Sequence, residues 1–369
     1  MPTAIVHDWL TGMRGGEKVL ESIGALYPDA DVYTLLRVPG STSPAIEGRR
    51  IRTSFLQHLP GASRFYRHYL PVFPTAIEQF DLDGYDLIIS SSHCAAKAVV
   101  APGRARHLCY CHSPMRYAWD QFSAYFGRER TGRLGEAALR PVLAWLARWD
   151  RATAPRVHRF VANSRFVADR IRRYYGRHAD VVHPPVDTEF YRPDATPPGD
   201  HFLVVSALVP YKRVDLAIAA CGRAGAPLRI VGTGPDRDRL EREAGPSVTF
   251  LGQLSDEEIR DQYRGARAVI LAGEEDFGIV PVEAQACGRP VVALGRGGAL
   301  ETVIDGETGV LFADTTPESL TAALECLGAL RPDPARIRDH AAQFSRSRFA
   351  ARFSEIVQET LAEPAGTRW

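Results

Sequence analysis

Short runs of apolar, largely β-branched residues alternate with stretches of helical periodicity along nearly the whole chain. This alternation is typical of parallel β-α-β units, in which a buried strand is followed by a helix. In the first half the pattern predicts strands at Ala4–Val6, Val32–Leu35, Leu87–Ser90, His107–Cys111, Phe160–Asn163 and Val181–His183. In the second half it predicts strands at Leu203–Ser206, Leu228–Gly232, Val248–Leu251, Ala268–Ala272, Val291–Leu294 and Val310–Phe312. We therefore expect an α/β fold with two doubly wound sheets.

The boundary between the halves is predicted in the stretch HPPVDTEFYRPDATPPGD, residues 183–200, which has five prolines and no periodicity. We place an N-terminal Rossmann-like domain at residues 1–185 and a C-terminal one at residues 186–345. The last helical stretch is longer than the second domain needs, so we assign residues 346–369 to a helix that crosses back to the first domain. Because doubly wound sheets bind ligands beyond the carboxyl ends of their strands, we expect the domains to face each other across a cleft.

Composition narrows the class of protein. The chain has 369 residues, 45% of them apolar and 24% charged, which suits a globular protein too long for a single core. A formal net charge of +1 and the lack of a basic arm argue against a nucleic-acid partner. The sequence shows no secretory signal and no apolar run that could cross a bilayer. We therefore expect a cytoplasmic protein with reduced cysteines.

Two carboxylates, Glu275 and Glu283, flank a predicted strand-to-helix turn in the segment GEEDFGIVPVEAQACG. Pro281 in the first turn and Gly288 as a stop predict a helix over Val280–Cys287. Backbone N–H groups of Phe277, Gly278, Ile279 and Val280 at its start form a site suited to a phosphate or diphosphate. Glu283 could then accept hydrogen bonds from a ribose diol, and Glu275 would lie nearer the sugar. Alternatively, Glu283 only complements the helix dipole and Glu275 is solvated.

The segment EEDFGIVPVEAQACGRPVVALGRGGALETVIDGETGVLF resembles the donor-binding motif of glycosyltransferase family 4, whose members are retaining enzymes of the GT-B fold. The similarity extends to SALVPYKRVDLAI, IVGTGPDRDRLE, VTFLGQLSDEEI and the N-terminal HDWLTGMRGGEKVLE, and so covers most of the chain. Within the family the sequence is most similar to bacterial mannosyltransferases that assemble O-antigen or exopolysaccharide repeats. The resemblance implies a nucleotide-sugar donor bound by the C-terminal domain.

Lys212, in VPYKRVD, follows the first strand of the second half, where a cation would neutralise charge on a leaving diphosphate. The family usually has an arginine five positions earlier, but this chain has Ala207 there. Either Arg213 substitutes for it or the site has one cation.

Several glycines follow predicted strands in the same way. Gly15 and Gly16 would let a loop close over phosphate or sugar, although a tight turn explains them as well. Gly232 would line the cleft, and by resemblance Leu254 would pack near the nucleotide base, although both also suit ordinary turns. The chain lacks a GxGxxG fingerprint, which disfavours a nicotinamide enzyme.

His112, in CYCHSPMRYAWD, lies at the carboxyl end of a predicted strand. Such a histidine is often structural, but the resemblance implies that it contacts the transferred sugar, so His112 and Glu275 are the candidate catalytic residues. Cys109 and Cys111 have no second ligand pair, so we expect no metal and no cofactor. The candidate acceptor-binding residues, for which a structural role fits equally well, are Asp8, Arg116, Tyr117 and Asn163.

The region between Thr131 and Phe160 has six arginines against Glu136 and Asp150, with leucines and tryptophans between them. This composition suits an amphipathic surface on anionic lipid, with the protein peripheral at the inner face of the plasma membrane. A solvated helix packed on the N-terminal domain is the competing interpretation.

The residues and the resemblance together predict transfer of a hexose, foremost mannose from GDP-mannose, to a glycan or lipid-linked acceptor hydroxyl in cell-surface polysaccharide synthesis. A UDP-sugar donor stays open. The alternatives are a sugar-nucleotide epimerase of the same fold and a non-catalytic nucleotide-sugar sensor.

Overall fold

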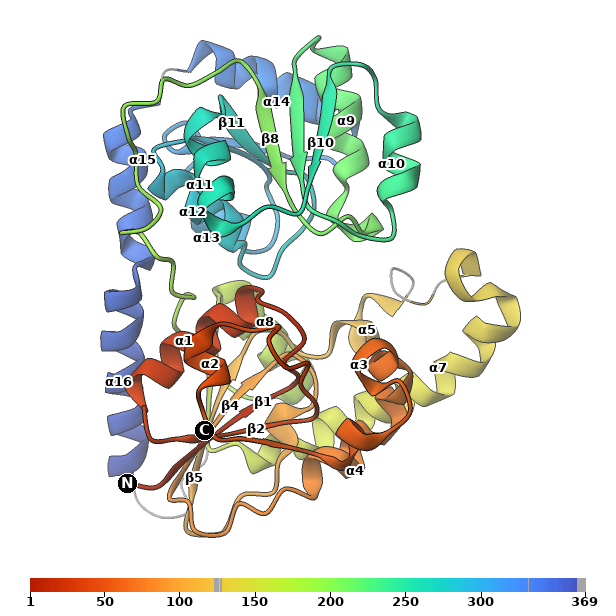
Figure 1. The fold of residues 1–369 in the computed structure, drawn as a ribbon, viewed down its shortest axis with the longest axis vertical. Helices are drawn as coiled ribbons and strands as arrows, with labels where there is room; N and C mark the ends of the chain where they lie inside the picture. Colours follow the sequence, from red (N-terminus) through yellow and green to blue (C-terminus); the bar gives the residue numbers. More distant parts are fainter. Residues whose placement is uncertain (123–125, 127, 331, 364–369) are drawn as a thin grey trace. The chain divides into compact units, whose positions relative to one another are not determined.

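The computed structural model describes residues 1–122, 126, 128–330 and 332–363, and the chain divides into two compact units (Figure 1). Unit 1 comprises Met1–Pro185 together with Phe349–Trp369, and unit 2 comprises Val186–Arg348. Each unit has its own parallel sheet and its own apolar core.

Within its described part, unit 1 has a seven-stranded sheet in the order β3-β2-β1-β4-β5-β6-β7. All neighbouring strands in it are parallel. The strands are β1 (Thr3–His7), β2 (Asp31–Thr34), β3 (Ile51–Thr53), β4 (Leu87–Ser92), β5 (Arg106–Cys111), β6 (Arg159–Ala162) and β7 (Ala179–Val181). The longer helices are α1 (Gly15–Leu26), α7 (Arg128–Thr153), α8 (Arg165–Tyr175) and α16 (Arg346–Ala362). Short helices are α2 (Pro44–Glu47), α3 (Ala62–Phe65), α4 (Phe73–Glu78) and α5 (Arg116–Trp119).

Unit 2, as far as it is described, has a six-stranded parallel sheet in the order β10-β9-β8-β11-β12-β13. The strands are β8 (Phe202–Val205), β9 (Leu228–Val231), β10 (Val248–Gly252), β11 (Ala268–Leu271), β12 (Val291–Leu294) and β13 (Gly309–Phe312). The helices are α9 (Val214–Arg223), α10 (Arg237–Glu243), α11 (Asp256–Gly265), α12 (Ile279–Ala286), α13 (Ala299–Thr302), α14 (Pro317–Ala329) and α15 (Pro334–Ala341). A 3₁₀ turn, η5 (Pro210–Lys212), follows β8.

Both sheets have the same switch point, because the first strand of each unit lies beside the fourth: β1 beside β4, and β8 beside β11. Loops that leave the two central strands at their carboxyl ends diverge there and leave room for a ligand. The strand pattern of the sequence is confirmed apart from two details. The three-residue β3 is too short and too exposed to give a periodic signal. β7 covers Ala179–Val181 instead of Val181–His183, and the prolines at 184 and 185 follow shortly after it.

Helix α16 packs on the sheet of unit 1, although it comes last in the chain. Phe349, Phe353, Ile356 and Val357 join the apolar cluster that contains Ile5, Leu108 and Tyr110. At its polar edge Arg159 donates to Asp180 and to Glu359, each over 2.7 Å. The helix ends at Ala362, and residues 364–369 of the predicted segment 346–369 lie outside the described residues.

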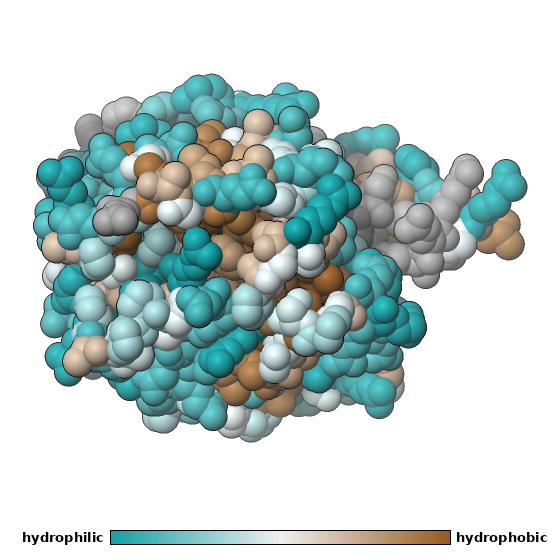
Figure 2. All heavy atoms as spheres, turned by 90° about the horizontal axis from the view of Figure 1, so that it is seen from above, coloured by the Kyte–Doolittle hydropathy of each residue, from teal (hydrophilic) through white to brown (hydrophobic). Residues whose placement is uncertain are grey.

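Hydrophilic residues predominate on the face shown in Figure 2, with hydrophobic residues in smaller patches between them. Throughout the described ranges, each helix is too short or too polar to cross a bilayer.

Candidate active site

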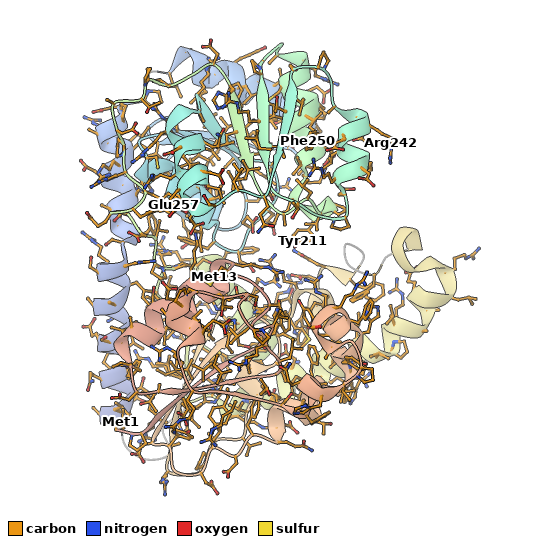
Figure 3. The ribbon with its side chains drawn as sticks, viewed as in Figure 1. Met1, Met13, Tyr211, Arg242, Phe250 and Glu257 are labelled. Carbon is orange, nitrogen blue, oxygen red and sulfur yellow. The ribbon has the colours of Figure 1, made fainter. Side chains whose placement is uncertain are left out.

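In unit 2 the loop after β11 lies directly against the loop after β8. A Cβ atom on Gly273 would come within 2.7 Å of the carbonyl oxygen of Tyr211 and 3.0 Å of the Cα of Lys212, so only glycine fits without a shift. Tyr211 is labelled in Figure 3. This close approach brings together Lys212 and Glu275, which are 63 positions apart in the sequence.

Lys212 and Glu275 form an ion pair in which Nζ donates to Oε1. The side chains are only 20% and 14% exposed, so the pair is shielded from water more than a surface pair would be. The structure therefore brings together the predicted phosphate-binding cation and the predicted catalytic carboxylate as an ion pair.

The turn between Glu275 and α12 has the form expected of an anion site. Gly278 takes a left-handed conformation, with φ of +84°, and α12 begins at Ile279 instead of the predicted Val280. The first N–H groups of a helix have no partner within it, and Gly278 has no side chain with which to cap them. Gly298 steadies the turn, because its N–H donates to the carbonyl of Glu275 over 2.8 Å.

Glu283 lies in the second turn of α12 and is only 5% exposed. The hydroxyl of Tyr263 donates to its Oε2 over 2.9 Å. Burial raises the pKa of Tyr263 and of Tyr191, and the neighbouring Glu283 carboxylate raises both further, so both tyrosines stay protonated donors. Glu283, the residue predicted to bind the ribose, is thus a carboxylate whose Oε2 accepts a hydrogen bond from within the protein.

The other predicted donor-binding residues of unit 2 have more local roles. Arg213 directs its guanidinium at Asp215, with Nε and Nη2 3.1–3.2 Å from the carboxylate oxygens, so it is engaged within its own turn. A Cβ on Gly232 would overlap the carbonyl oxygen of Ser206, so this glycine lets the loop after β9 contact the end of β8. Leu254 packs, partly buried, against the core that contains Phe277.

In unit 1 the candidate His112 follows β5 and belongs to a buried polar chain. Its Nε2 lies 2.8 Å from the Oγ of Ser91, which lies 3.1 Å from the Nδ1 of His7. The Nε2 of His7 is 3.8 Å from Oε1 of Glu17, at the start of α1. Gly16 packs on this chain, because its Cβ would lie 3.6 Å from the His7 ring and 3.8 Å from His112 Nε2.

Burial and neighbouring charges shift the pKa values of His112 and Glu17, the two ends of this polar chain. Burial lowers the pKa of His112 well below its usual value, and His93 and His7 lower it further. Burial is the largest influence on Glu17 and would raise its pKa, but His7, His93 and a backbone N–H together outweigh it, so the pKa of this carboxyl lies below its ordinary value. At neutral pH we therefore assign a neutral His112 and an ionised Glu17.

Asp8, a predicted acceptor-binding residue, is fully buried. Its carboxylate accepts four backbone N–H groups of the loop after β4, those of His93, Cys94, Ala95 and Ala96, over 2.6–2.9 Å. These hydrogen bonds give Asp8 a structural role in this loop, which was the alternative interpretation from the sequence.

Two more predicted acceptor residues brace the loop after β5. Asn163 donates from Nδ2 to the carbonyl of His112 over 2.9 Å, and the Tyr117 hydroxyl lies 2.7 Å from the Cys94 thiol. Arg116 begins α5. Gly15 begins α1, after a loop that includes Met13, labelled in Figure 3.

Sequence reasoning missed His7, Ser91, Glu17 and His93. Their one signal was the position of His7 and Ser91 at the ends of two predicted strands. That signal becomes specific only with the parallel register that places His7 beside Ser91.

Two parallel sheets with the same switch point, each with polar residues at the carboxyl ends of its strands, define a protein of the GT-B fold class. Solved structures show the same fold across the chain. One is HepE of Anabaena with UDP and glucose, with a TM-score of 0.72, 20% identity, and coverage of 97% of this chain and 100% of that one. Another is sucrose-phosphate synthase of Thermosynechococcus elongatus, with a TM-score of 0.70, 19% identity, and coverage of 98% and 100%.

Family models match both units. The model described as "Glycosyltransferase Family 4" matches residues 13–190, and "Glycosyl transferases group 1" matches residues 188–344. The chain belongs to glycosyltransferase family 4.

Curated relatives are about one third identical to this chain over an alignment that covers about half of it. The D-inositol 3-phosphate glycosyltransferase of Rhodococcus erythropolis is 34% identical over 219 residues, which are 51% of this chain and 49% of the relative. The GDP-mannose-dependent alpha-(1-6)-phosphatidylinositol monomannoside mannosyltransferase of Mycolicibacterium smegmatis is 36% identical over 204 residues, 47% of this chain and 53% of the relative. The chain thus spans about half the length of the curated relatives it matches.

Proposed function

We propose that the chain is a retaining hexosyltransferase that moves a sugar from a nucleotide-diphosphate donor to an acceptor hydroxyl. The observation that carries the proposal is the Lys212–Glu275 pair beside the start of α12. At one switch point, a cation and helix N–H groups suit the diphosphate of the donor, and a carboxylate beside them suits its sugar.

In this proposal the donor separates the ion pair and takes over its two partners. The diphosphate binds to Lys212 and to the N–H groups of Ile279 and Val280, while Glu283 accepts from the ribose. Glu275, released from Lys212, orients the sugar and stabilises the positive charge that develops on it. His112 of unit 1 contacts the transferred sugar.

Transfer then proceeds on one face of the sugar. The bond from the anomeric carbon to the phosphate oxygen breaks, a bond to the acceptor oxygen forms on the same face, and the leaving phosphate takes the acceptor proton. Lys212 and the helix N–H groups carry the charge of the leaving group, so we propose that no divalent ion is obligatory.

Mannose from GDP-mannose is the proposed donor. The name of the Mycolicibacterium smegmatis relative supports it, as does the resemblance to bacterial mannosyltransferases. Among the described residues we assign none to reading the base, so the support for guanine comes from the relative's name and the resemblance. Uridine diphosphate sugars are the alternative.

The test is a panel of nucleotide sugars incubated with the chain, with and without a bacterial lipid extract as acceptor, in which nucleotide release and new glycan are measured. Release from GDP-mannose alone supports the proposed donor, and release from a UDP-sugar alone replaces it. An isomerised donor without release would instead indicate the epimerase, and binding without turnover the sensor.

A lipid-linked acceptor in cell-surface polysaccharide synthesis is proposed together with a peripheral position on anionic membrane. On α7, Leu143 and Leu146 are buried in unit 1, whereas Leu134 is 88% and Trp145 45% exposed among arginines. The exposed part, and not the whole helix, is therefore the surface that would contact lipid.

Flotation with vesicles that contain anionic lipid tests this surface. We expect binding at low salt that weakens as salt screens the arginines, and weaker binding by a Leu134→Ser/Trp145→Ser variant. Equal flotation of the variant and the original chain, or none by either, would reject it.

A further inference from the structure

The polar chain that ends at His112 runs through three elements of unit 1. His7 closes β1, Ser91 lies beside it in β4, and Glu17 belongs to the first turn of α1. Glu17 and His7 are 3% and 0% exposed, and the 3.8 Å between Oε1 and Nε2 is too long for a hydrogen bond, so their contact is electrostatic. The Glu17 carboxylate is held at its other oxygen, because Oε2 accepts the backbone N–H of Arg14 over 3.0 Å.

This arrangement gives the hydrogen bonds one direction. Glu17 lies 3.8 Å from Nε2 of His7 and favours the proton on that nitrogen; in the neutral tautomer of His7 that carries it, Nδ1 is an acceptor. Ser91 therefore donates to His7, and its oxygen accepts from Nε2–H of His112. The reverse order would direct a lone pair of His7 at a carboxylate.

The other ring nitrogen of His112, Nδ1, is then the one that carries a lone pair. Within the part of the chain that the structure describes, Nδ1 of His112 has no hydrogen-bond partner. The ring is packed against Tyr110 and His93, with centroids 5.2 and 6.3 Å away, and its Nε2 lies 2.8 Å from Ser91 Oγ. Burial holds the ring neutral, so Nδ1 keeps its lone pair.

We propose that Glu17, His7 and Ser91 are positioning residues that fix His112 in the Nε2–H form and so make its Nδ1 an obligatory hydrogen-bond acceptor. Such a nitrogen binds a hydroxyl group, which can donate, and rejects an ionised phosphate oxygen, which cannot. This rests on the proposed function only in naming a sugar hydroxyl as the ligand. Glu17 thus acts on sugar recognition without touching the sugar.

The decisive variant is Glu17→Gln. The N–H of Arg14 holds the amide oxygen where Oε2 is now, so the amide NH₂ takes the place of Oε1 beside His7. A donor there favours a lone pair on Nε2 of His7, which reverses the two hydrogen bonds of Ser91 and moves the His112 proton to Nδ1. The capping hydrogen bond is kept, so the helix start is preserved.

The tautomer is read by NMR of the full chain with ¹⁵N-labelled histidine, in which protonated and unprotonated ring nitrogens have distinct shifts. Among the signals of the eleven histidines, those of His112 are the ones lost in His112→Gln. We expect Nε2–H in the original chain, Nδ1–H in Glu17→Gln, and no reversal in Glu17→Gln/Ser91→Ala, because Ser91 transmits it. Ser90→Ala is the matched control, since Ser90 lies on the opposite face of β4 and bonds His107 over 2.8 Å.

In the transfer assay Glu17→Gln should lower kcat/KM by about tenfold, the effect of one lost hydrogen bond, whereas Ser90→Ala should not. An Nδ1–H form in the original chain, or an unchanged His112 in a folded Glu17→Gln, would overturn the proposal. If Glu17→Gln does not fold, the tautomer of the original chain still decides the matter. Absence of any transfer activity would overturn the proposed function but leave the NMR result intact.

Discussion

The Lys212–Glu275 ion pair links binding to chemistry in the proposed reaction. There a diphosphate that binds Lys212 displaces Glu275, which then carries an unpaired charge next to the sugar. An unpaired, partly buried carboxylate is costly, and a positive charge on the reacting sugar relieves that cost.

Substitution of Glu275 and substitution of Glu283 should affect different kinetic constants. Glu275→Gln removes a charge needed only as the sugar becomes positive, so kcat should fall about 100-fold with little change in KM. Glu283→Ala removes a hydrogen-bond acceptor used in binding, so KM for the donor should rise about tenfold with little change in kcat. Steady-state kinetics over a range of donor concentrations measures both, and small, equal effects would contradict the assignment.

His107 makes the stability of the chain depend on pH. Burial lowers the pKa of this histidine from its ordinary 6.5 to about 3. Between these values the unfolded chain binds a proton that the folded chain does not, so the free energy of unfolding falls as pH drops through this window.

Urea unfolding at about pH 7 and about pH 5 measures this dependence. We expect His107→Gln to be less stable near neutral pH but to lose less stability on acidification. His58→Gln, at an exposed position, is the control and should keep the original dependence. An unchanged pH dependence in His107→Gln would mean that other groups cause it.

At the residue scale, the sequence could predict which side chains share one loop, but not which side chains on neighbouring strands contact each other. Glu275, Gly278 and Glu283 share one turn, so their spacing alone predicted their neighbourhood. His7 and Ser91 are 84 positions apart and meet only through strand register. Asp8 shows the same limit, because sequence places a carboxylate at a strand end but not the four N–H groups that bind it.

At the scale of elements, glycines set how closely the loops of unit 2 approach. We expect Gly273→Ala to push the loop after β11 away from Tyr211 and Lys212, at a cost of about 1–3 kcal/mol in stability. Lys212 and Glu275 would then separate, and donor binding should weaken. Calorimetric titration with GDP or UDP and thermal unfolding measure the two effects.

Gly222→Ala is the matched control for that loop. Gly222 lies in α9, and a Cβ there would meet no atom within 4 Å, so alanine should be neutral or slightly stabilising. If both variants bound nucleotide like the original chain, the close approach at Gly273 would not matter for the site.

The elements themselves were largely predictable, because buried parallel strands give continuous apolar runs with clear ends. Twelve predicted strands each overlap a strand of the structure. The apolar residues of α7 were harder, since periodicity shows that a helix has an apolar face but not whether protein or lipid covers it. The burial of Leu143 and Leu146 assigns much of that face to the core of unit 1.

At the scale of the whole molecule, unit 1 depends on residues from the far end of the chain. Phe353 is fully buried and stacks on Phe349, with ring centroids 5.4 Å apart. Phe353→Ala should destabilise unit 1 by about 3–5 kcal/mol through the cavity it leaves. Hydrogen exchange followed by mass spectrometry should then show faster exchange in β1 and β5 but unchanged exchange in β8 and β11.

Gln358→Ala, on the exposed side of the same helix, is the control for that experiment and should leave exchange unchanged in both units. Equal acceleration in both units after Phe353→Ala would show that they unfold together. No acceleration in either would show that α16 contributes little to unit 1.

The discontinuity of unit 1 also has a consequence for synthesis on the ribosome. Residues 1–185 emerge first, yet the apolar surface that α16 covers stays open until the last helix has been made. Unit 2, whose residues 186–348 are contiguous, can complete its core before that moment. The N-terminal unit is therefore the later of the two to finish folding, and a chain released before α16 is made would keep unit 2 folded but expose an apolar surface of unit 1 to chaperones and proteases.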